Sequence, residues 1–137
     1  MKIDILTPTM ATKATVTTIY PEFISKNVVE GKYYVHDYES LKKSDVRVVC
    51  AGMEVCQQTY CIDRTGFKYF AIEYIASGSC ELELNGKTYE ISSGCCFVYG
   101  PNTPHKITSV GESPLKKYFV DRRSKVQTTL FNIHILG

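Results

Sequence analysis

The amino-acid sequence predicts an all-β fold, a sandwich or a barrel, and three observations support that prediction. Runs rich in Val, Ile, Tyr and Phe recur from residue 33 to residue 121, with turn residues between them at strand-like spacing. Residues 80–84 (CELEL) alternate strictly between apolar and polar side chains, as a strand with one buried face does. No stretch alternates strands with helices, so a parallel sheet is not expected.

The turns divide this region into strands. Asn85-Gly86 is the strongest hairpin signal, because both residues tolerate positive φ. Ser93-Gly94 marks the next turn. The expected strands, in order, are 46–50, 54–62, 68–76, 80–84, 87–92, 95–99, 105–110 and 115–121.

Three parts of the chain are expected. Residues 1–30 contain Pro8 and Pro21 and show no helical period, so they should form an N-terminal arm or edge segment. Residues 31–121 should form the barrel, and residues 122–137 a tail.

The tail is expected to contain a short helix. Ser124 can cap it, and Val126, Leu130 and Ile133 recur at helical spacing. Several β-branched residues in the same stretch oppose a helix, so a strand stays open as the alternative.

Composition restricts the classes of function. The 137 residues fit one domain, and 44% apolar with 22% charged residues is typical of a globular protein. The formal net charge is only +2 and no long basic block is present, so a nucleic-acid-binding module is not indicated. No run of about 18 apolar residues occurs, so no membrane span is expected.

The six cysteines are interpreted as buried thiols in a reducing cytoplasm. No C-x-x-C pair occurs, and the spacing matches no zinc site. A disulfide or a metal role is the alternative. They are Cys50, Cys56, Cys61, Cys80, Cys95 and Cys96.

Two segments resemble a cupin. Residues 77–94 (SGSCELELNGKTYEISSG) are similar to its glycine-bounded strand pair, and residues 97–105 (FVYGPNTPH) to the strand and turn that end in a histidine. The resemblance covers roughly residues 45–121 and implies a cupin-type double-sheet jelly-roll barrel with a cup that holds ligands.

Many cupins bind a metal through H-x-H, a glutamate and a later histidine. The matching positions here hold Arg64, Gly66, Ala71 and His105, so three of the four ligands are missing. One imidazole does not hold a divalent metal, and we therefore expect neither a metal nor another cofactor.

A narrower resemblance is to the N-terminal ligand-sensing domain of AraC-type transcription regulators. Residues 60–75 (YCIDRTGFKYFAIEYI) and 115–121 (LKKYFVD) carry it, and the chain departs from it at Arg122-Arg123-Ser124. The resemblance implies small-molecule sensing and homodimerisation. It implies DNA binding only through a C-terminal helix-turn-helix half, which should begin where this chain stops, at Gly137. The chain is then either an excised sensor domain or a free-standing relative.

Period two suggests which side chains face the cup. If Ala71 faces it, then Tyr69, Glu73 and Ile75 share that face. A glutamate inside a barrel is costly unless it is paired, and Arg64 is the natural partner. The two could read the hydroxyls of a sugar, or they could form a structural ion pair, or Glu73 could face solvent.

His105 follows the rigid turn of residues 101–104, which aims its side chain reproducibly. It either contacts a ligand or is a satisfied core histidine. Tyrosine rings suit stacking on a sugar, although they suit barrel packing equally well. The candidate ligand-binding residues are Tyr60, Arg64, Tyr69, Glu73, Tyr99, His105 and Tyr118.

We therefore expect a cytoplasmic, non-enzymatic effector-binding and dimerisation domain of an AraC-like regulator, with a carbohydrate or another small polar metabolite as effector. One alternative is a free-standing small cupin enzyme acting on a sugar or related metabolite. Another is a structural dimerisation domain whose cup is filled by its own side chains.

Overall fold

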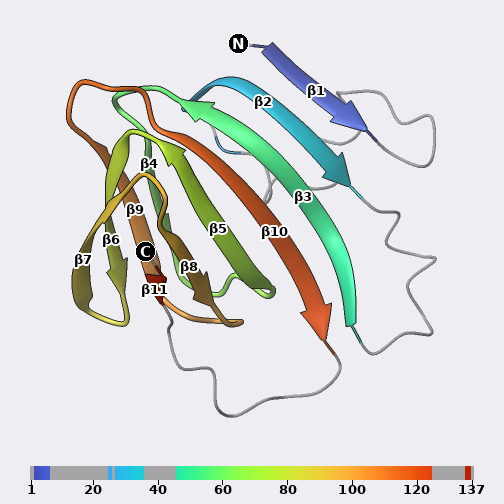
Figure 1. Cartoon of the computed structure of the whole chain (residues 1–137). Coiled ribbons are helices and arrows are strands. Elements are labelled where there is room, and N and C mark those ends of the chain that lie inside the picture. The colour runs from blue at the N-terminus through green and yellow to red at the C-terminus, as the bar shows by residue number, and fades with distance from the viewer. Residues whose placement is uncertain (1, 7–24, 26, 36–45, 125–134, 137) are drawn as a thin grey trace.

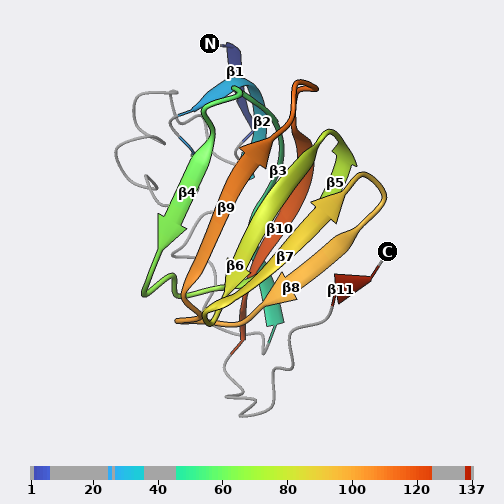
Figure 2. The ribbon, with the colours of Figure 1, turned by 90° about the vertical axis from the view of Figure 1, so that its left-hand side faces the viewer.

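Two facing β-sheets form the computed structural model of the chain, which describes residues 2–6, 25, 27–35, 46–124 and 135–136. Figure 1 shows the larger sheet curving along one side, and Figure 2 shows the smaller sheet in front of it. The described residues form strands and turns without a helix, so the all-β prediction is confirmed. Within these residues, nothing resembles a membrane-crossing helix.

Seven strands form the large sheet, in the order β1-β2-β3-β10-β5-β8-β11. All neighbours are antiparallel except β1 and β2, which are parallel. Their bounds are β1 (Lys2–Leu6), β2 (Val28–Val35), β3 (Val46–Cys56), β10 (Lys116–Ser124), β5 (Phe70–Ser77), β8 (Cys96–Tyr99) and β11 (Ile135–Leu136).

The small sheet has the order β4-β9-β6-β7, with every neighbouring pair antiparallel. Its strands are β4 (Cys61–Arg64), β9 (His105–Val110), β6 (Ser79–Leu84) and β7 (Lys87–Ser92). The predicted hairpin joins β6 to β7, and Asn85 and Gly86 both have positive φ. The turn residues thus behave as their chemistry requires.

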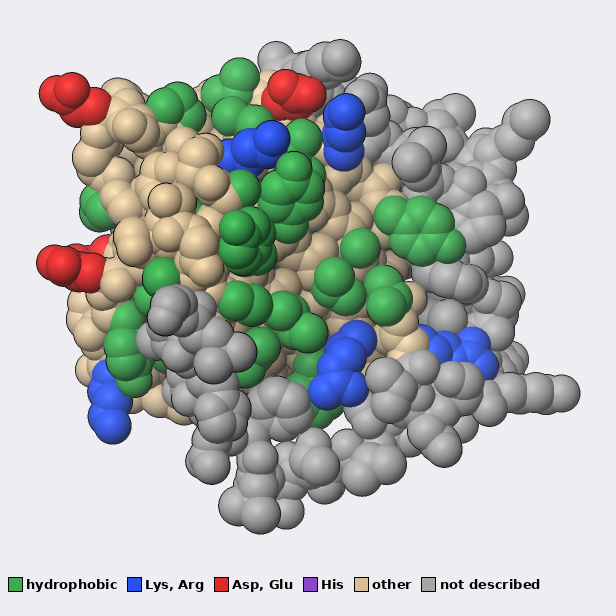
Figure 3. Space-filling model, in the orientation of Figure 1, with side chains coloured by type: hydrophobic (Ala, Val, Ile, Leu, Met, Phe, Trp, Pro, Cys, Tyr) green, Lys and Arg blue, Asp and Glu red, His purple; other side chains and the backbone are tan. Residues whose placement is uncertain are grey.

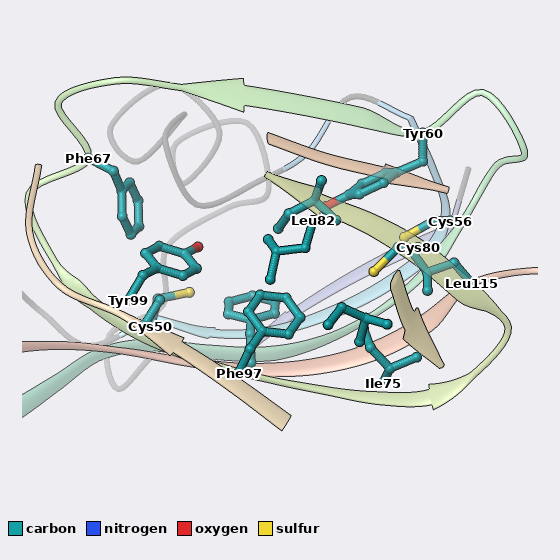
Figure 4. Close-up of a cluster of buried hydrophobic side chains, with 14 of the residues drawn as sticks. Cys50, Cys56, Tyr60, Phe67, Ile75, Cys80, Leu82, Phe97, Tyr99 and Leu115 are labelled. Carbon is teal, nitrogen blue, oxygen red and sulfur yellow. The ribbon is translucent and has the colours of Figure 1, made fainter. Parts of the chain in front are cut away.

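The space between the sheets is filled by apolar side chains that alternate along the strands. In β6, Cys80, Leu82 and Leu84 are fully buried, and in β5 Ala71 and Ile75 are buried while Ile72 is exposed. This is the period-two arrangement expected when one face of each sheet covers the core. Figure 4 shows the cluster, with Phe67 and Tyr99 near one end and Tyr60 near the other.

Two strand predictions were wrong in their bounds. Residues 46–50 and 54–62 were expected to form separate strands, but β3 runs unbroken from Val46 to Cys56, and β4 begins only at Cys61. The amide of Tyr60 donates to the carbonyl of Gln57 and closes a turn there, which carries the chain from the large sheet to the small one. Because apolar residues lie on both sides of that turn, the hydrophobic pattern indicated one continuous strand.

The ends of the barrel also differ from expectation. Strand β2 crosses the expected boundary between arm and barrel at residue 30, and β10 runs on to Ser124. Ser124 is therefore the last residue of a strand. The rest of the predicted helix, residues 125–134, lies outside the described residues.

All six cysteines are free thiols. Cys50, Cys56 and Cys80 are buried as predicted, and burial raises the pKa of the Cys56 and Cys80 thiols to about 12. Cys61 is exposed, because its side chain lies on the outer face of the small sheet. The interpretation of all six as buried thiols was wrong for Cys61, and Cys95 and Cys96 are only partly buried.

Candidate functional site

Two rows of residues meet at the end of the barrel where β5 and β9 begin. In the large sheet Asp121 lies beside Ala71, and Ala71 lies beside Tyr99. In the small sheet Arg64 lies directly opposite His105. Directly opposed residues of antiparallel strands point to the same side of a sheet, so each row presents its side chains together.

Aromatic rings join the two rows. The rings of Tyr99 and His105 have centroids 4.2 Å apart with an interplanar angle of 31°. Phe67, in the loop between β4 and β5, contacts the rings of Tyr69, Tyr99 and His105 with centroid distances of 5.4, 6.4 and 6.0 Å. The Arg64 guanidinium lies 5.1 Å from the centre of the Phe67 ring. Phe67 therefore connects the predicted site residues at this end.

His105 has one satisfied and one unsatisfied ring nitrogen. Its Nδ1 lies 2.9 Å from the carbonyl oxygen of Thr103, and because a carbonyl only accepts, Nδ1 carries a proton. Burial lowers the pKa of His105, despite the opposing effect of that hydrogen bond. The ring is then neutral and Nε2 is an acceptor. Nε2 is buried and has no hydrogen-bond partner among the described residues.

Asp121 is a second polar side chain held inside this end. It is 5% exposed, and no hydrogen bond or ion pair joins its carboxyl group to the part of the chain described here. Burial, together with the negative charge of Glu73, raises the pKa of Asp121 to about 8. The carboxyl group is therefore mostly protonated at neutral pH.

The predicted pairing of Arg64 with Glu73 was wrong. Glu73 is buried and cup-facing as predicted, but its Oε2 lies 3.0 Å from Nζ of Lys117. Lys117 enters from β10, the neighbour of β5, and reaches the carboxylate from within the same sheet. Arg64 is half-buried and directs its guanidinium over Phe67.

Lys117 also pairs with a second carboxylate. Its Nζ lies 3.1 Å from Oε2 of Glu54 on β3, and all three charged side chains are nearly fully buried. Burial alone would lower the pKa of Lys117, but Glu54 and Glu73 outweigh it and hold that pKa well above its usual range. Burial alone would raise the pKa of Glu73, yet Lys117 outweighs it and lowers that pKa. Both groups are charged at neutral pH.

Tyrosine hydroxyls complete this ion cluster of Glu54, Glu73 and Lys117. Tyr99 donates to Oε1 of Glu73 at 2.9 Å, and Tyr33 donates to Oε1 of Glu54 at 2.7 Å. Tyr60 donates to Oε2 of Glu54 at 3.4 Å. Burial raises the pKa of all three phenols, so they stay donors. The cluster is satisfied by its own hydrogen bonds, whereas Nε2 of His105 and the Asp121 carboxyl group have no hydrogen-bond partner among the described residues.

The remaining predicted site residues lie in different places. Tyr69 is buried at the same end as His105 through its contact with Phe67, while Tyr60 is fully buried near the opposite end. Tyr118 is 45% exposed on the outer face of the large sheet, beside Tyr74, so it points away from the interior. Figure 3 shows hydrophobic side chains gathered on an outer face, with Lys and Arg side chains above and below them.

A hollow of about 220 Å³ borders His105 on the outer side of the small sheet. Asp63, Glu83 and Lys106, which lie side by side in one cross-strand row, line much of it. None of the described residues form a group of three His, Cys, Asp or Glu side chains able to hold a metal ion.

Sequence reasoning missed three residues that shape this interior: Glu54, Asp121 and Lys117. Strict alternation along residues 115–121 places Leu115, Lys117, Phe119 and Asp121 on one face, and Leu115 marks that face as buried. A buried lysine and aspartate on that face would have followed from the period alone.

The chain matches known proteins at the level of family and fold. The model of the AraC-like ligand-binding domain matches residues 47–125, more than half of the chain. No curated protein sequence matches it.

Solved structures share the fold at low sequence identity. The Escherichia coli protein YhaK superposes with a TM-score of 0.62 at 16% identity, over 77% of this chain and 49% of its own. The plu4264 protein of Photorhabdus luminescens superposes with a TM-score of 0.55 at 9% identity, over 72% of this chain and 78% of its own. The Schizosaccharomyces pombe Cnp3 cupin domain superposes with a TM-score of 0.51 at 12% identity, over 65% of this chain and 72% of its own. The fold is thus that of a cupin, and the chain spans about half the length of YhaK.

Proposed function

This chain belongs to the family of AraC-like ligand-binding domains, and we propose that it binds a small polar molecule, of the carbohydrate class, at the barrel end where Arg64 and His105 lie. The observation that carries the proposal is the buried Nε2 of His105, which accepts no hydrogen bond from the described residues. A buried acceptor left without a donor costs roughly 1–3 kcal/mol. A ligand hydroxyl that donates to Nε2 would recover that cost on binding.

The surroundings of His105 fit such a ligand. Phe67 and Tyr99 offer aromatic faces against which the apolar face of a sugar ring can stack. Arg64 offers guanidinium donors to ligand oxygens, and it has no carboxylate partner among the described residues. Donors, an acceptor and flat apolar surface together are what a sugar needs for recognition.

The proposal extends to regulation in the cytoplasm. Under this proposal the domain binds its effector without converting it chemically. The domain then controls a helix-turn-helix domain to which it is attached in the complete regulator. Control follows if the effector binds one arrangement of the barrel better than another and so shifts the population between them.

We also propose that the domain forms a homodimer through the outer face of the large sheet. Val48, Ile72, Tyr74 and Tyr118 are each more than 40% exposed there, and flat apolar sheet faces pack well on one another. Phe70, which the sequence places on the same strand, is buried beneath Arg122 and does not contribute. Light scattering on the double variant Tyr74→Glu/Tyr118→Glu should detect a monomer where the wild type is a dimer. An unchanged mass would exclude this face.

Ligand binding is tested with a thermal-shift panel of neutral sugars and sugar acids. A compound that binds only the folded state must raise the unfolding midpoint in a concentration-dependent way. The proposal expects such a rise for the wild type and none for His105→Phe. A panel without any rise would favour a barrel that serves a structural role.

A further inference from the structure

Asp121 places a carboxyl group at a buried position where packing alone would favour an apolar side chain. It is the last inward-facing residue of β10 before the strand irregularity between Asp121 and Arg122, and the apolar Cys50 and Ala71 flank it on β3 and β5. A carboxyl group at such a place is expected only if something compensates its burial. The described residues supply no hydrogen bond to it.

Its row leads directly to the proposed ligand site. Asp121 lies beside Ala71, Ala71 lies beside Tyr99, and the Tyr99 ring contacts His105. The Asp121 carboxyl group and Nε2 of His105, neither of which has a hydrogen-bond partner among the described residues, are therefore at one end of the barrel, on opposite sheets. A small molecule bound at this end would lie near both groups.

We propose that Asp121 is a ligand-binding residue, and that its carboxyl group donates a hydrogen bond to the same molecule that donates to Nε2 of His105. The inference rests on the function proposed above and defines its ligand more closely. The ligand must offer a hydroxyl donor and a nearby acceptor oxygen. Neutral sugars and sugar acids both provide that pair.

The charges around Asp121 favour the protonated form. Burial and Glu73 of β5 raise its pKa to about 8, while Lys117 of β10 and Arg64 of β4 oppose them, and Glu54 of β3 adds to them. A protonated carboxyl both donates and accepts, whereas the ionised form only accepts. Binding should therefore weaken as Asp121 ionises.

Four of the other groups facing this region, His105, Glu73, Tyr99 and Lys117, do not titrate in the same range. The pKa of His105 is lowered by burial, and the pKa of Glu73 is lowered by Lys117 against the opposing effect of burial. Burial raises the pKa of Tyr99, and the two carboxylates raise that of Lys117. The Cys50 thiol lies beside Asp121 on β3, and thiols ordinarily titrate near pH 8.5, so a change in affinity between pH 7 and 9 reports Asp121 only where Asp121→Asn abolishes it.

The experiment measures the dissociation constants of D-galactose, D-xylose, D-galacturonate and D-gluconate at pH 7 and 9. A group with a pKa near 8 loses about nine-tenths of its protonated form over that interval, so wild-type affinity should fall about tenfold. Asp121→Asn keeps a donor that cannot ionise, so it should bind with little pH dependence. Asp121→Ala should lose about tenfold or more at pH 7.

The control is Asp63→Asn, an exposed aspartate on the outer face of β4, which should behave as the wild type does. Equal affinity of the wild type and Asp121→Ala for a bound probe would overturn the inference and leave the proposed function standing. An identical pH profile for Asp121→Asn and the wild type would also overturn it. Failure of every probe to bind the wild type at either pH would contradict the proposed function, and this inference with it.

Discussion

The imidazole of His105 lies against the phenol ring of Tyr99 with ring centroids 4.2 Å apart. Tyr99 belongs to the large sheet and His105 to the small one, so this contact joins the two sheets at one end of the barrel. Beyond Tyr99 the hydrogen bonds continue to Glu73 and its partner Lys117. The proposed ligand site thus rests on a fully paired ion cluster that fixes Tyr99.

Replacing the unsatisfied imidazole should separate binding from stability. His105→Phe removes a buried acceptor without a partner among the described residues and keeps an aromatic ring beside Tyr99 and Phe67, but it also removes the hydrogen bond from Nδ1 to the Thr103 carbonyl, so the unfolding free energy should fall by only about 1 kcal/mol. Sugar affinity should fall about tenfold or more, since a ligand hydroxyl loses its acceptor. Urea denaturation and titration calorimetry measure the two effects. A variant that unfolds easily would instead identify His105 as a structural residue.

Removing the buried cation should be severe. Lys117→Met leaves Glu54 and Glu73 buried beside each other without their partner, which should cost about 3–5 kcal/mol at pH 7. The loss should shrink at lower pH, where the two carboxyl groups can take up protons. Lys116→Met, the adjacent outward-facing lysine, is the control and should change stability by less than about 0.5 kcal/mol. Denaturation of both variants at pH 5 and 7 measures these losses of stability. Equal losses for Lys117→Met and Lys116→Met at pH 7 would contradict the prediction.

Two tyrosines that sequence reasoning treated alike should differ. Tyr99→Phe deprives a buried Glu73 oxygen of its donor and should cost about 1–2 kcal/mol. Tyr118→Phe changes an exposed hydroxyl on the outer face and should be neutral in both stability and sugar binding. Denaturant midpoints and binding titrations compare them. Loss of binding in Tyr118→Phe would mean that the ligand lies outside the barrel.

Stability should depend on pH through Asp121. Its pKa is about 8 in the folded chain and near its ordinary value of 3.8 when unfolded, so between these values the folded state holds a proton that the unfolded state has released. Stability from this group therefore falls as pH rises from about 4 to about 8 and is level above. The unfolding free energy of Asp121→Asn should therefore rise relative to that of the wild type as the pH increases over that range. Parallel pH profiles of the two unfolding free energies would refute the assignment.

Two turn glycines allow a steric test. Gly78 and Gly86 have φ of +74° and +78°, but a Cβ on Gly78 would lie 2.6 Å from the carbonyl oxygen of Pro114, while none would be near Gly86. Gly86→Ala should cost only the strained backbone, about 1–2 kcal/mol. Gly78→Ala should cost more, because backbone must also move. Thermal unfolding of both variants measures the difference, and equal midpoints would show that the turn at Gly78 adapts.

The sequence predicted the double-sheet fold because alternation and turn chemistry are local. Cys80, Leu82 and Leu84 mark a buried face, and Asn85-Gly86 fixes the hairpin. The same alternation correctly directed Tyr69, Glu73 and Ile75 inward. Pattern alone did not show where β3 passes into β4, since apolar residues lie on both sides of the short polar turn at residues 57–59.

The site was harder to predict because its contacts join distant strands. Glu73 pairs with Lys117, 44 positions away, and not with the nearer Arg64. Sheet order decides this, since β10 lies next to β5 while β4 belongs to the other sheet. Tyr118 shows the converse, because its chain neighbours Lys117 and Phe119 face inward and it therefore faces out.

The central claim, that a ligand hydroxyl donates to His105, is tested most directly by nitrogen NMR of the histidine rings. The protein is titrated with whichever panel sugar raises the unfolding midpoint most, and the His105 signals are assigned by their loss in His105→Phe. We predict that Nε2 shifts on saturation as an acceptor gaining a hydrogen bond, while the protonated Nδ1, bound to Thr103, stays in place. An unchanged Nε2 signal with the sugar fully bound would contradict the account.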